Sequence, residues 1–267
     1  MTMSENLQIS AQEKMVIYAA RQLKPFDNKQ ALIGIGLPVL ASQVAKYLWC
    51  GGLKSIIENG SFDAIIAEIP FSLFGGRISY GCSAQLDNGF ALSGAKRGRV
   101  EIGFLGAAQV DKYGNINTTQ IGPIDNPKFR IAGSGGAVDI GCYCAHTFIV
   151  CAQSKRTFVN QVDYVTTPGW VAPDNTKAGR AWVPRETLRL TGGPAAIITN
   201  LGIMKFDEKT KEAYLDEYYP GVTIEQILDN TGFDLDVSRA READGITGEE
   251  LTVLRTKVDP LNIYKTR

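Results

Sequence analysis

The chain has 267 residues, and its hydrophobic fraction of 44% is enough for one large core. Its 28 basic and 28 acidic residues leave no net charge, which argues against a nucleic acid or an anionic membrane as partner. The first residues lack the basic-then-apolar order of a signal peptide, and no apolar run approaches the length of a membrane span. We therefore expect a cytoplasmic protein.

The cysteines and the histidine narrow the possible chemistry. The chain has 5 cysteines, and the one close pair, Cys142 and Cys144, lacks the spacing of a metal or redox motif. We expect them to behave as small buried hydrophobic residues. The single histidine, His146, heads an apolar run and is expected to pack at a strand end. A Ser-His-Asp triad or a histidine-rich metal site is therefore not predicted.

The predicted elements begin with a helix. Ser10 and Glu13 form a capping-box pattern ahead of apolar residues at helical spacing, and this helix should end near Lys24 and Pro25. Residues 31–35 form a short apolar run that predicts a buried strand. A glycine turn then leads into a second helix, with Pro38 near its first turn.

Further apolar runs predict the remaining strands. They cover residues 55–57, 64–66, 102–105, 148–150 and 195–199, and helical or glycine-rich stretches separate them. Runs that are apolar on both faces favour an α/β fold with a largely parallel sheet and helices on both faces, in three layers. No linker or repeat divides the chain, so residues 1–267 are expected to form a single domain. Residues 176–191, rich in charge and proline, are expected to form a surface excursion.

The sharpest candidate for chemistry is Glu58, which follows the predicted strand 55–57 directly and precedes Asn59 and Gly60. Ligands of open α/β sheets bind beyond the carboxyl ends of the strands, so this carboxylate would be rigidly held and face a cleft. Gly60 permits a backbone conformation that other residues avoid. The alternative is a helix cap or an ordinary turn carboxylate.

Glycine-rich turns supply the second candidate. The run Gly133-Ser-Gly-Gly136 precedes a predicted helix over residues 137–143, and exposed N–H groups there would bind an oxyanion or a phosphate. Its spacing is not that of a dinucleotide-binding motif, and the alternative is a tight turn. Gly34 and Gly36 form a similar strand-to-helix turn.

Together these segments resemble the β subunit of the class I CoA-transferases, of the glutaconate CoA-transferase type. Glu58-Asn59-Gly60 is similar to the Ser-Glu-Asn-Gly signature of that family, with Ile57 in place of the serine. That departure removes a hydroxyl beside the carboxylate and bears on substrate detail more than on reaction class. The other segments that match in order and approximate spacing are 34–38, 109–115, 133–139, 155–170, 202–207, 218–220 and 229–238.

The resemblance implies a ping-pong transfer of CoA between carboxylic acids. Glu58 would be the nucleophile, because a carboxylate forms both an anhydride and a thioester without an external energy source. The backbone N–H of Gly136, with Gly135 beside it, would stabilise the oxyanion. Residues expected to bind CoA or the acyl substrate are Asn59, Gly60, Gly34, Gly36 and Gln109. Arg97 and Arg99 would meet the CoA phosphates, unless they form an ordinary solvated basic loop.

The resemblance also implies a partner. A separate α subunit of similar fold would complete the active site at the interface, in an α₂β₂ or larger assembly. CoA would enter as a substrate, with no permanently bound cofactor and no metal.

Three other interpretations remain open. An acyl-CoA hydrolase, a ring-opening hydrolase or a decarboxylase would keep this fold, but the relatives of that kind replace the glutamate that Glu58 retains here. A ligand sensor would need a DNA-binding segment, and the region before the first helix is too short for one. A purely structural role is disfavoured because Glu58 and the glycine run occur together.

Overall fold

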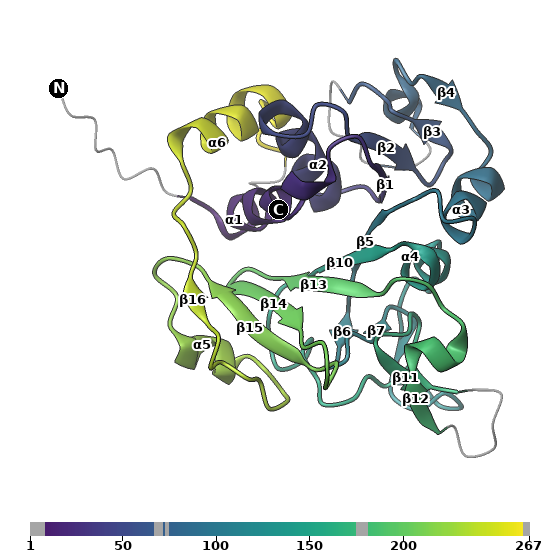
Figure 1. The fold of residues 1–267 in the computed structure, drawn as a ribbon, viewed down its shortest axis with the longest axis vertical. Coiled ribbons are helices and arrows are strands. Elements are labelled where there is room, and N and C mark those ends of the chain that lie inside the picture. The colour runs from purple at the N-terminus through teal and green to yellow at the C-terminus, as the bar shows by residue number, and fades with distance from the viewer. Residues whose placement is uncertain (1–8, 67–71, 73–74, 175–180, 264–267) are drawn as a thin grey trace.

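The computed structural model describes residues 9–66, 72, 75–174 and 181–263, and among them a mixed sheet forms the centre (Figure 1). Its strands are β1 (Gln30–Ile33), β2 (Lys54–Ile57), β3 (Ser61–Phe62), β4 (Ala84–Gln85), β5 (Ile102–Gly106), β10 (His146–Val150), β13 (Pro194–Ile198), β14 (Gly202–Phe206), β15 (Ala213–Tyr218) and β16 (Arg241–Glu242).

The strand order is β16-β15-β14-β13-β10-β5-β1-β2-β3-β4. The five central strands, from β13 to β2, are all parallel, which confirms the predicted class of fold. Antiparallel strands extend the sheet on both sides, with β14 and β15 next to β13 and with β3 and β4 next to β2. The carboxyl ends of the central strands therefore meet at one edge of the sheet.

Helices cover both faces of this sheet (Figure 1). They are α1 (Ala11–Gln22), α2 (Leu37–Leu48), α3 (Asn88–Lys96), α4 (Ala137–Tyr143), α5 (Ile224–Asp229) and α6 (Gly248–Val253). The predicted capping box of the first helix is present, because Ser10 Oγ accepts from the Glu13 N–H and Glu13 Oε2 accepts from the Ser10 N–H. Pro38 lies in the first turn of α2, as expected.

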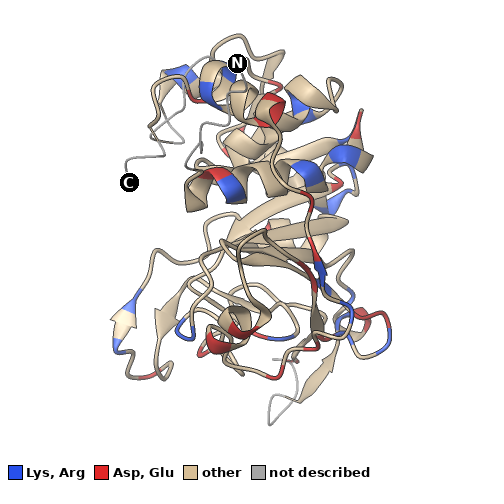
Figure 2. Ribbon diagram, turned by 90° about the vertical axis from the view of Figure 1, so that its left-hand side faces the viewer, with Lys and Arg blue, Asp and Glu red and all other residues tan. Residues whose placement is uncertain are grey.

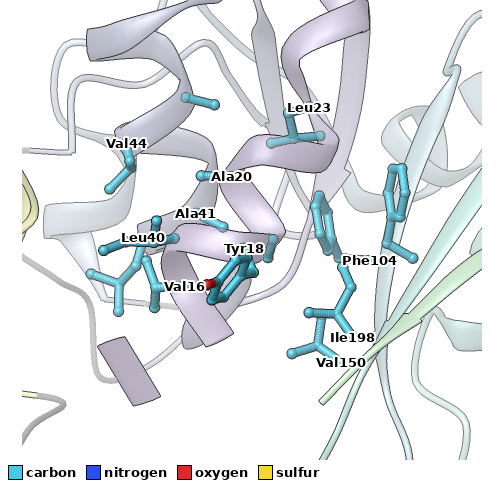
Figure 3. Packing of buried hydrophobic residues seen from close by; sticks show 14 of the residues in the cluster. Val16, Tyr18, Ala20, Leu23, Leu40, Ala41, Val44, Phe104, Val150 and Ile198 are labelled. Carbon is cyan, nitrogen blue, oxygen red and sulfur yellow. The ribbon is translucent and has the colours of Figure 1, made fainter. Parts of the chain in front are cut away.

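Each central strand contributes to two separate cores, one on each face. In β1, Ala31 and Ile33 pack against α1 and α2, whereas Leu32 packs on the opposite face with residues of α3 and α4. Figure 3 shows the first core, in which Val16 and Leu40 lie on the two helices and Phe104 on the sheet. Side chains alternate between faces along a strand, so a strand buried on both sides is apolar at most positions.

Smaller elements surround the main sheet among the described residues. Three two-stranded ribbons are formed by β6 (Gln109–Val110) with β7 (Ile116–Asn117), β8 (Gln120–Ile121) with β9 (Phe129–Arg130), and β11 (Val171–Pro173) with β12 (Trp182–Pro184). Short helical turns occur at Lys24–Phe26, Gly76–Ser79, Arg185–Leu188 and Leu254–Val258.

One detail of the expected fold is wrong, and another is correct only in part. The apolar run at residues 64–66 is a loop, and the strand that pairs with β2 is β3, which lies just before it. Ala64 is buried but Ile65 is 62% exposed, so the run is not the two-sided core strand that its composition suggested. The predicted surface excursion at 176–191 is correct only in part, because residues 175–180 lie outside the described part of the chain and Arg185 is completely enclosed.

The minor predictions agree with the structure for four of the five cysteines and for the place of His146 at a strand end. Four cysteines are buried, Cys82 is half-buried, and all five are free thiols. His146 begins β10 and its ring lies 5.0 Å from that of Phe26, centre to centre. Basic and acidic residues are interspersed in the view of Figure 2. None of the helices in the described ranges is both long and apolar enough to cross a membrane.

Candidate active site

The candidate site lies at the carboxyl end of β2. Ile33 of β1 pairs with Ile57 of β2, so Gly34 and Glu58 lie just beyond the ends of two adjacent parallel strands. Glu58 is half-buried, and a Cβ added to Gly34 would meet nothing within 4 Å. The sheet edge therefore holds the Glu58 backbone rigidly and leaves open space beside Gly34.

Glu58 contacts the glycine run that lies far from it in the sequence. The Gly136 N–H donates a hydrogen bond of 3.0 Å to Glu58 Oε1 across 78 residues. Gly136 caps the N-terminus of α4, where backbone N–H groups have no partner within the helix and favour a negative charge. A Cβ on residue 136 would lie only 2.1 Å from Glu58 Oε1, so only glycine permits this approach.

The glycine run before α4 has a backbone suited to bind an anion. Gly133 and Gly135 have φ angles of 95° and 47°, and Gly136 returns to −77°. Successive residues with φ of opposite sign turn their N–H groups toward a common concave side. The base of the run is fixed by Thr118, whose carbonyl accepts from the Gly133 N–H at 2.9 Å and whose hydroxyl donates to the Gly133 carbonyl at 2.8 Å.

Side chains hold the backbone on both sides of the carboxylate. Asn88, the first residue of α3, donates from Nδ2 to the Glu58 carbonyl at 2.7 Å. Gln85 of β4 donates from Nε2 to the Asn59 carbonyl at 2.9 Å. The Asn59 side chain turns inward, because its Oδ1 accepts from the Ser61 N–H at 3.0 Å. Side-chain amides, and not charged groups, therefore hold the backbone of the turn that follows β2.

Gly60 completes the turn in a conformation that glycine adopts readily. Its φ is 93°, and an added Cβ would lie 1.9 Å from the Leu86 carbonyl oxygen. Its own carbonyl accepts from the Leu86 N–H at 2.9 Å. The segment that carries Gln85 and Asn88 therefore lies directly over the turn that follows Glu58.

Of the other residues proposed from the sequence, some lie near Glu58 and others do not. Gly36 is the N-cap of α2 with φ of 97°, at the same sheet edge as Glu58. Gln109 is 6% exposed, and its amide contacts Asn117 and Asp163 instead of any residue around Glu58. Arg97 and Arg99 are exposed and lie beyond the far end of α3, about 13 Å along the helix from Asn88.

Sequence reasoning missed the residues that support the site. Gln85 precedes α3 and Asn88 begins it, but no pattern connects that helix with residue 58, although Asp87 is recognisable as an N-cap and accepts from the Phe90 N–H. Leu92 of α3 also lies against the Glu58–Gly136 contact, within 3.0 Å of where a Cβ of residue 136 would be. Asn88 and Leu92 are four residues apart in α3 and therefore share one face of that helix. This spacing is visible in the sequence, but it does not show that the face lies against Glu58.

A buried carboxyl group outside this cluster is structural. Asp111 lies in the loop between β6 and β7, where its carboxylate accepts from Asn115 Nδ2 and from the N–H groups of Tyr113 and Asn115. Burial raises the pKa of Asp111 to about 6. Within the described ranges, no group of three metal-ligating side chains is present.

Known proteins share both this fold and this sequence. The coenzyme A transferase family model matches residues 14–230, so the chain belongs to the coenzyme A transferase family. The β subunit of glutaconate CoA-transferase from Acidaminococcus fermentans is 38% identical, with 97% of this chain and 96% of the relative covered. The β subunit of 3-oxoadipate CoA-transferase from Pseudomonas knackmussii is 36% identical, with 92% of each covered.

A solved structure agrees with these relatives. The glutaconate CoA-transferase structure from Acidaminococcus fermentans superposes with a TM-score of 0.86 at 36% identity, over 96% of each chain. The chain is therefore a CoA-transferase of the β-subunit type, as its sequence indicates. The hydrolase, decarboxylase and sensor interpretations are not favoured.

Proposed function

We propose that Glu58 is the covalent nucleophile of a ping-pong CoA transfer and that the Gly136 N–H stabilises the oxyanions formed along the way. The observation that carries this proposal is the hydrogen bond of 3.0 Å between the Gly136 N–H and Glu58 Oε1. It brings a carboxylate from a strand end and a donor from a helix N-terminus to within reach of one acyl carbon.

The reaction then proceeds through balanced acyl transfers. A Glu58 oxygen attacks the thioester carbonyl of an acyl-CoA, the C–S bond breaks, and CoA leaves as the thiolate while an acyl-glutamyl anhydride forms. The thiolate attacks the Glu58 carbonyl of that anhydride, which releases the first acid and leaves a glutamyl-CoA thioester. An acceptor carboxylate reverses the sequence and leaves with CoA, which restores the free Glu58 carboxylate.

The resting contact has a consequence for the first step. A carboxylate oxygen that accepts the Gly136 N–H is less nucleophilic than a bare one, and the same N–H is needed by the substrate oxyanion. Entry of the acyl-CoA carbonyl beside Gly136 would transfer the donor from Glu58 to the substrate. The binding energy of the long CoA chain is available to drive this exchange.

The substrates and the assembly are inferred from the relatives. Both relatives are named for acids with two carboxyl groups, so we take a dicarboxylic acid of similar length as the acyl group. A separate α subunit would complete the pocket at an interface, in an α₂β₂ or larger cytoplasmic complex. Gly34 borders open space beside Glu58, and Gly36 and Asn59 belong to the turns that follow β1 and β2. Arg97 with Arg99 would reach the phosphates only at the far end of CoA. CoA is a substrate, and the mechanism needs no permanently bound cofactor.

The decisive experiment is intact-mass analysis of this chain, purified with its α subunit and incubated with a panel of acyl-CoAs. The expected result is a CoA-sized adduct on Glu58. Sodium borohydride should reduce that thioester to an alcohol and leave a stable mass change at residue 58. The adduct should be absent in Glu58→Gln and unchanged in the control Glu208→Gln, an exposed glutamate at the turn after β14.

Two outcomes would refute the proposal. An adduct that persists in Glu58→Gln would place the nucleophile elsewhere. Consumption of acyl-CoA without an adduct and without an acceptor acid would identify a hydrolase or a decarboxylase.

A further inference from the structure

Arg185 is a buried cation on a segment that its sequence places on the surface. It begins the short turn Arg185–Leu188 and is 1% exposed. Its guanidinium contacts only backbone carbonyls, and no salt bridge among the described residues includes it. The carbonyls within 3.4 Å belong to Gly141, Cys142, Pro168, Gly169 and Thr191. Burial without a carboxylate is unfavourable for a charge, so this arrangement needs an explanation.

Arg185 binds the C-terminal end of α4, the helix that has Gly136 as its N-cap. Nη2 donates to the carbonyls of Gly141 and Cys142 at 2.5 and 3.1 Å, and both residues lie in the last turn of α4. Carbonyls at a helix C-terminus have no partner within the helix and carry a partial negative charge. A planar guanidinium spreads its N–H donors over three nitrogens and can bridge carbonyls that lie apart, whereas the donors of a lysine all lie on one nitrogen.

The same guanidinium fastens the segment against which α4 packs. Nη1 donates to the Pro168 carbonyl at 2.7 Å. One residue earlier, the Thr167 hydroxyl donates to the Ala137 carbonyl at 3.2 Å, one residue after Gly136. Thr167 is so close to the helix that a Cβ on Gly141 would lie 2.0 Å from its Cγ2. Arg185 and residues 167–169 therefore hold α4 at both ends.

A helix of this length has no independent stability, so its position depends on these anchors. α4 comprises 7 residues, about two turns, and short helices in water are marginal without tertiary contacts. The N–H of Gly136 is fixed to α4, and a displacement of the helix by about 1 Å would misplace the donor relative to Glu58.

We propose that Arg185 is a positioning residue for CoA transfer, which sets the position of the Gly136 donor by holding the C-terminus of α4. This inference rests on the roles proposed above for Glu58 and Gly136. It assigns a function to residues 167–169, which belong to the stretch 155–170 that resembles the family without any evident chemistry. Arg185 acts through the helix and touches neither substrate nor nucleophile.

The test compares Arg185→Lys and Arg185→Ala in the full complex with the control Arg189→Ala, an exposed arginine in the same segment. Steady-state kinetics, the rate of CoA-adduct formation on Glu58 and hydrogen exchange of residues 137–144 are measured for each. Both Arg185 variants should lower kcat by about 10- to 100-fold, with KM for the acyl-CoA within about twofold of wild type. Added guanidinium should restore several-fold activity to Arg185→Ala, and Arg189→Ala should behave as wild type.

Each result has a defined meaning. Loss of exchange protection in residues 137–144 together with a loss confined to kcat supports the positioning role. Arg185→Lys with kcat and exchange like those of wild type would overturn it, and so would an equal change in kcat and KM without guanidinium rescue. If Arg185→Ala does not fold, Arg185→Lys decides, since lysine keeps the charge and much of the volume. Glu58→Gln in the same assays distinguishes a failure of the nucleophile assignment from a failure of the positioning role. The glutamine oxygen can still accept the Gly136 N–H, so hydrogen exchange of residues 137–144 should match wild type while the CoA adduct is lost.

Discussion

Replacement of Gly136 by alanine is the most direct perturbation of the site. The new Cβ would lie 2.1 Å from Glu58 Oε1, where real contacts are at least about 3 Å, so the oxygen or the helix must move by about 1 Å. The second close atom, Leu92 Cδ2 at 3.0 Å, belongs to a side chain that can rotate away. The backbone of Gly136 has φ −77° and ψ 0°, which alanine adopts, so the fold should survive.

Gly136→Ala is therefore expected to remove the oxyanion donor without unfolding the protein. A shift of this size lengthens the 3.0 Å hydrogen bond beyond bonding distance. Removal of one oxyanion donor lowers kcat by about 100- to 1000-fold, roughly 3 kcal/mol. Steady-state transfer by the complex measures this, and urea denaturation should show a free energy of unfolding within about 1 kcal/mol of wild type.

A second glycine provides the matched control. Gly94 lies inside α3, where an added Cβ would be 3.7 Å from Val100 Cγ2, an ordinary contact. Gly94→Ala should keep full activity and stabilise the chain by about 0.5–1 kcal/mol through helix propensity. A Gly136→Ala complex with kcat within about threefold of wild type would refute the role of this donor, because a lost oxyanion donor costs far more.

Three further predictions test the surroundings. Asn88→Ala removes the donor to the Glu58 carbonyl and should lower kcat about two- to tenfold with unchanged thermal stability. An unchanged kcat would show that the side-chain amide of Asn88 is dispensable. Gly60→Ala forces a Cβ to within 1.9 Å of the Leu86 carbonyl and should lower the free energy of unfolding by about 2 kcal/mol or more, whereas an unchanged urea midpoint would contradict the turn geometry. Asp111 has a pKa raised to about 6, so the folded chain binds its proton more tightly than the unfolded chain, and its stabilising contribution is lost as pH rises from about 4 to 6. Asp111→Asn should therefore flatten the fall in unfolding free energy over this range by up to about 3 kcal/mol, and parallel profiles for the two proteins would contradict the assignment.

The parts of the fold that local sequence determines were predictable. Strands such as β1 are apolar at Ala31, Leu32 and Ile33 because both faces are buried, and the Ser10 capping box marks its helix directly. The apolar run at 64–66 was wrongly predicted to be a strand, because its composition could not show that it lacks strand partners. The antiparallel strands β14 and β15 pair with the strands next to them along the chain, but both are only partly buried, so they lack the continuous apolar run that marks the central strands.

The site was predictable only where a family motif marked it. Glu58 and the glycine run were found separately, but their contact across the sheet follows from register and strand order, which the sequence does not display. Asn88 and Gln85 act through single side-chain amides, so they left no periodic signal. Arg185 was expected on the surface because charge normally indicates exposure, and backbone carbonyls as partners are invisible in a sequence.

The 78-residue separation of carboxylate and donor also bears on biosynthesis. At about 5–20 residues per second, Glu58 leaves the ribosome about 4 to 16 s before Gly136. During that interval the nascent chain carries the proposed nucleophile without the proposed donor, and α4 lacks its contacts with Arg185 until that residue is translated as well. A chain that terminates before residue 136 therefore lacks the proposed donor, and such truncated products are expected to be inert toward cellular CoA esters.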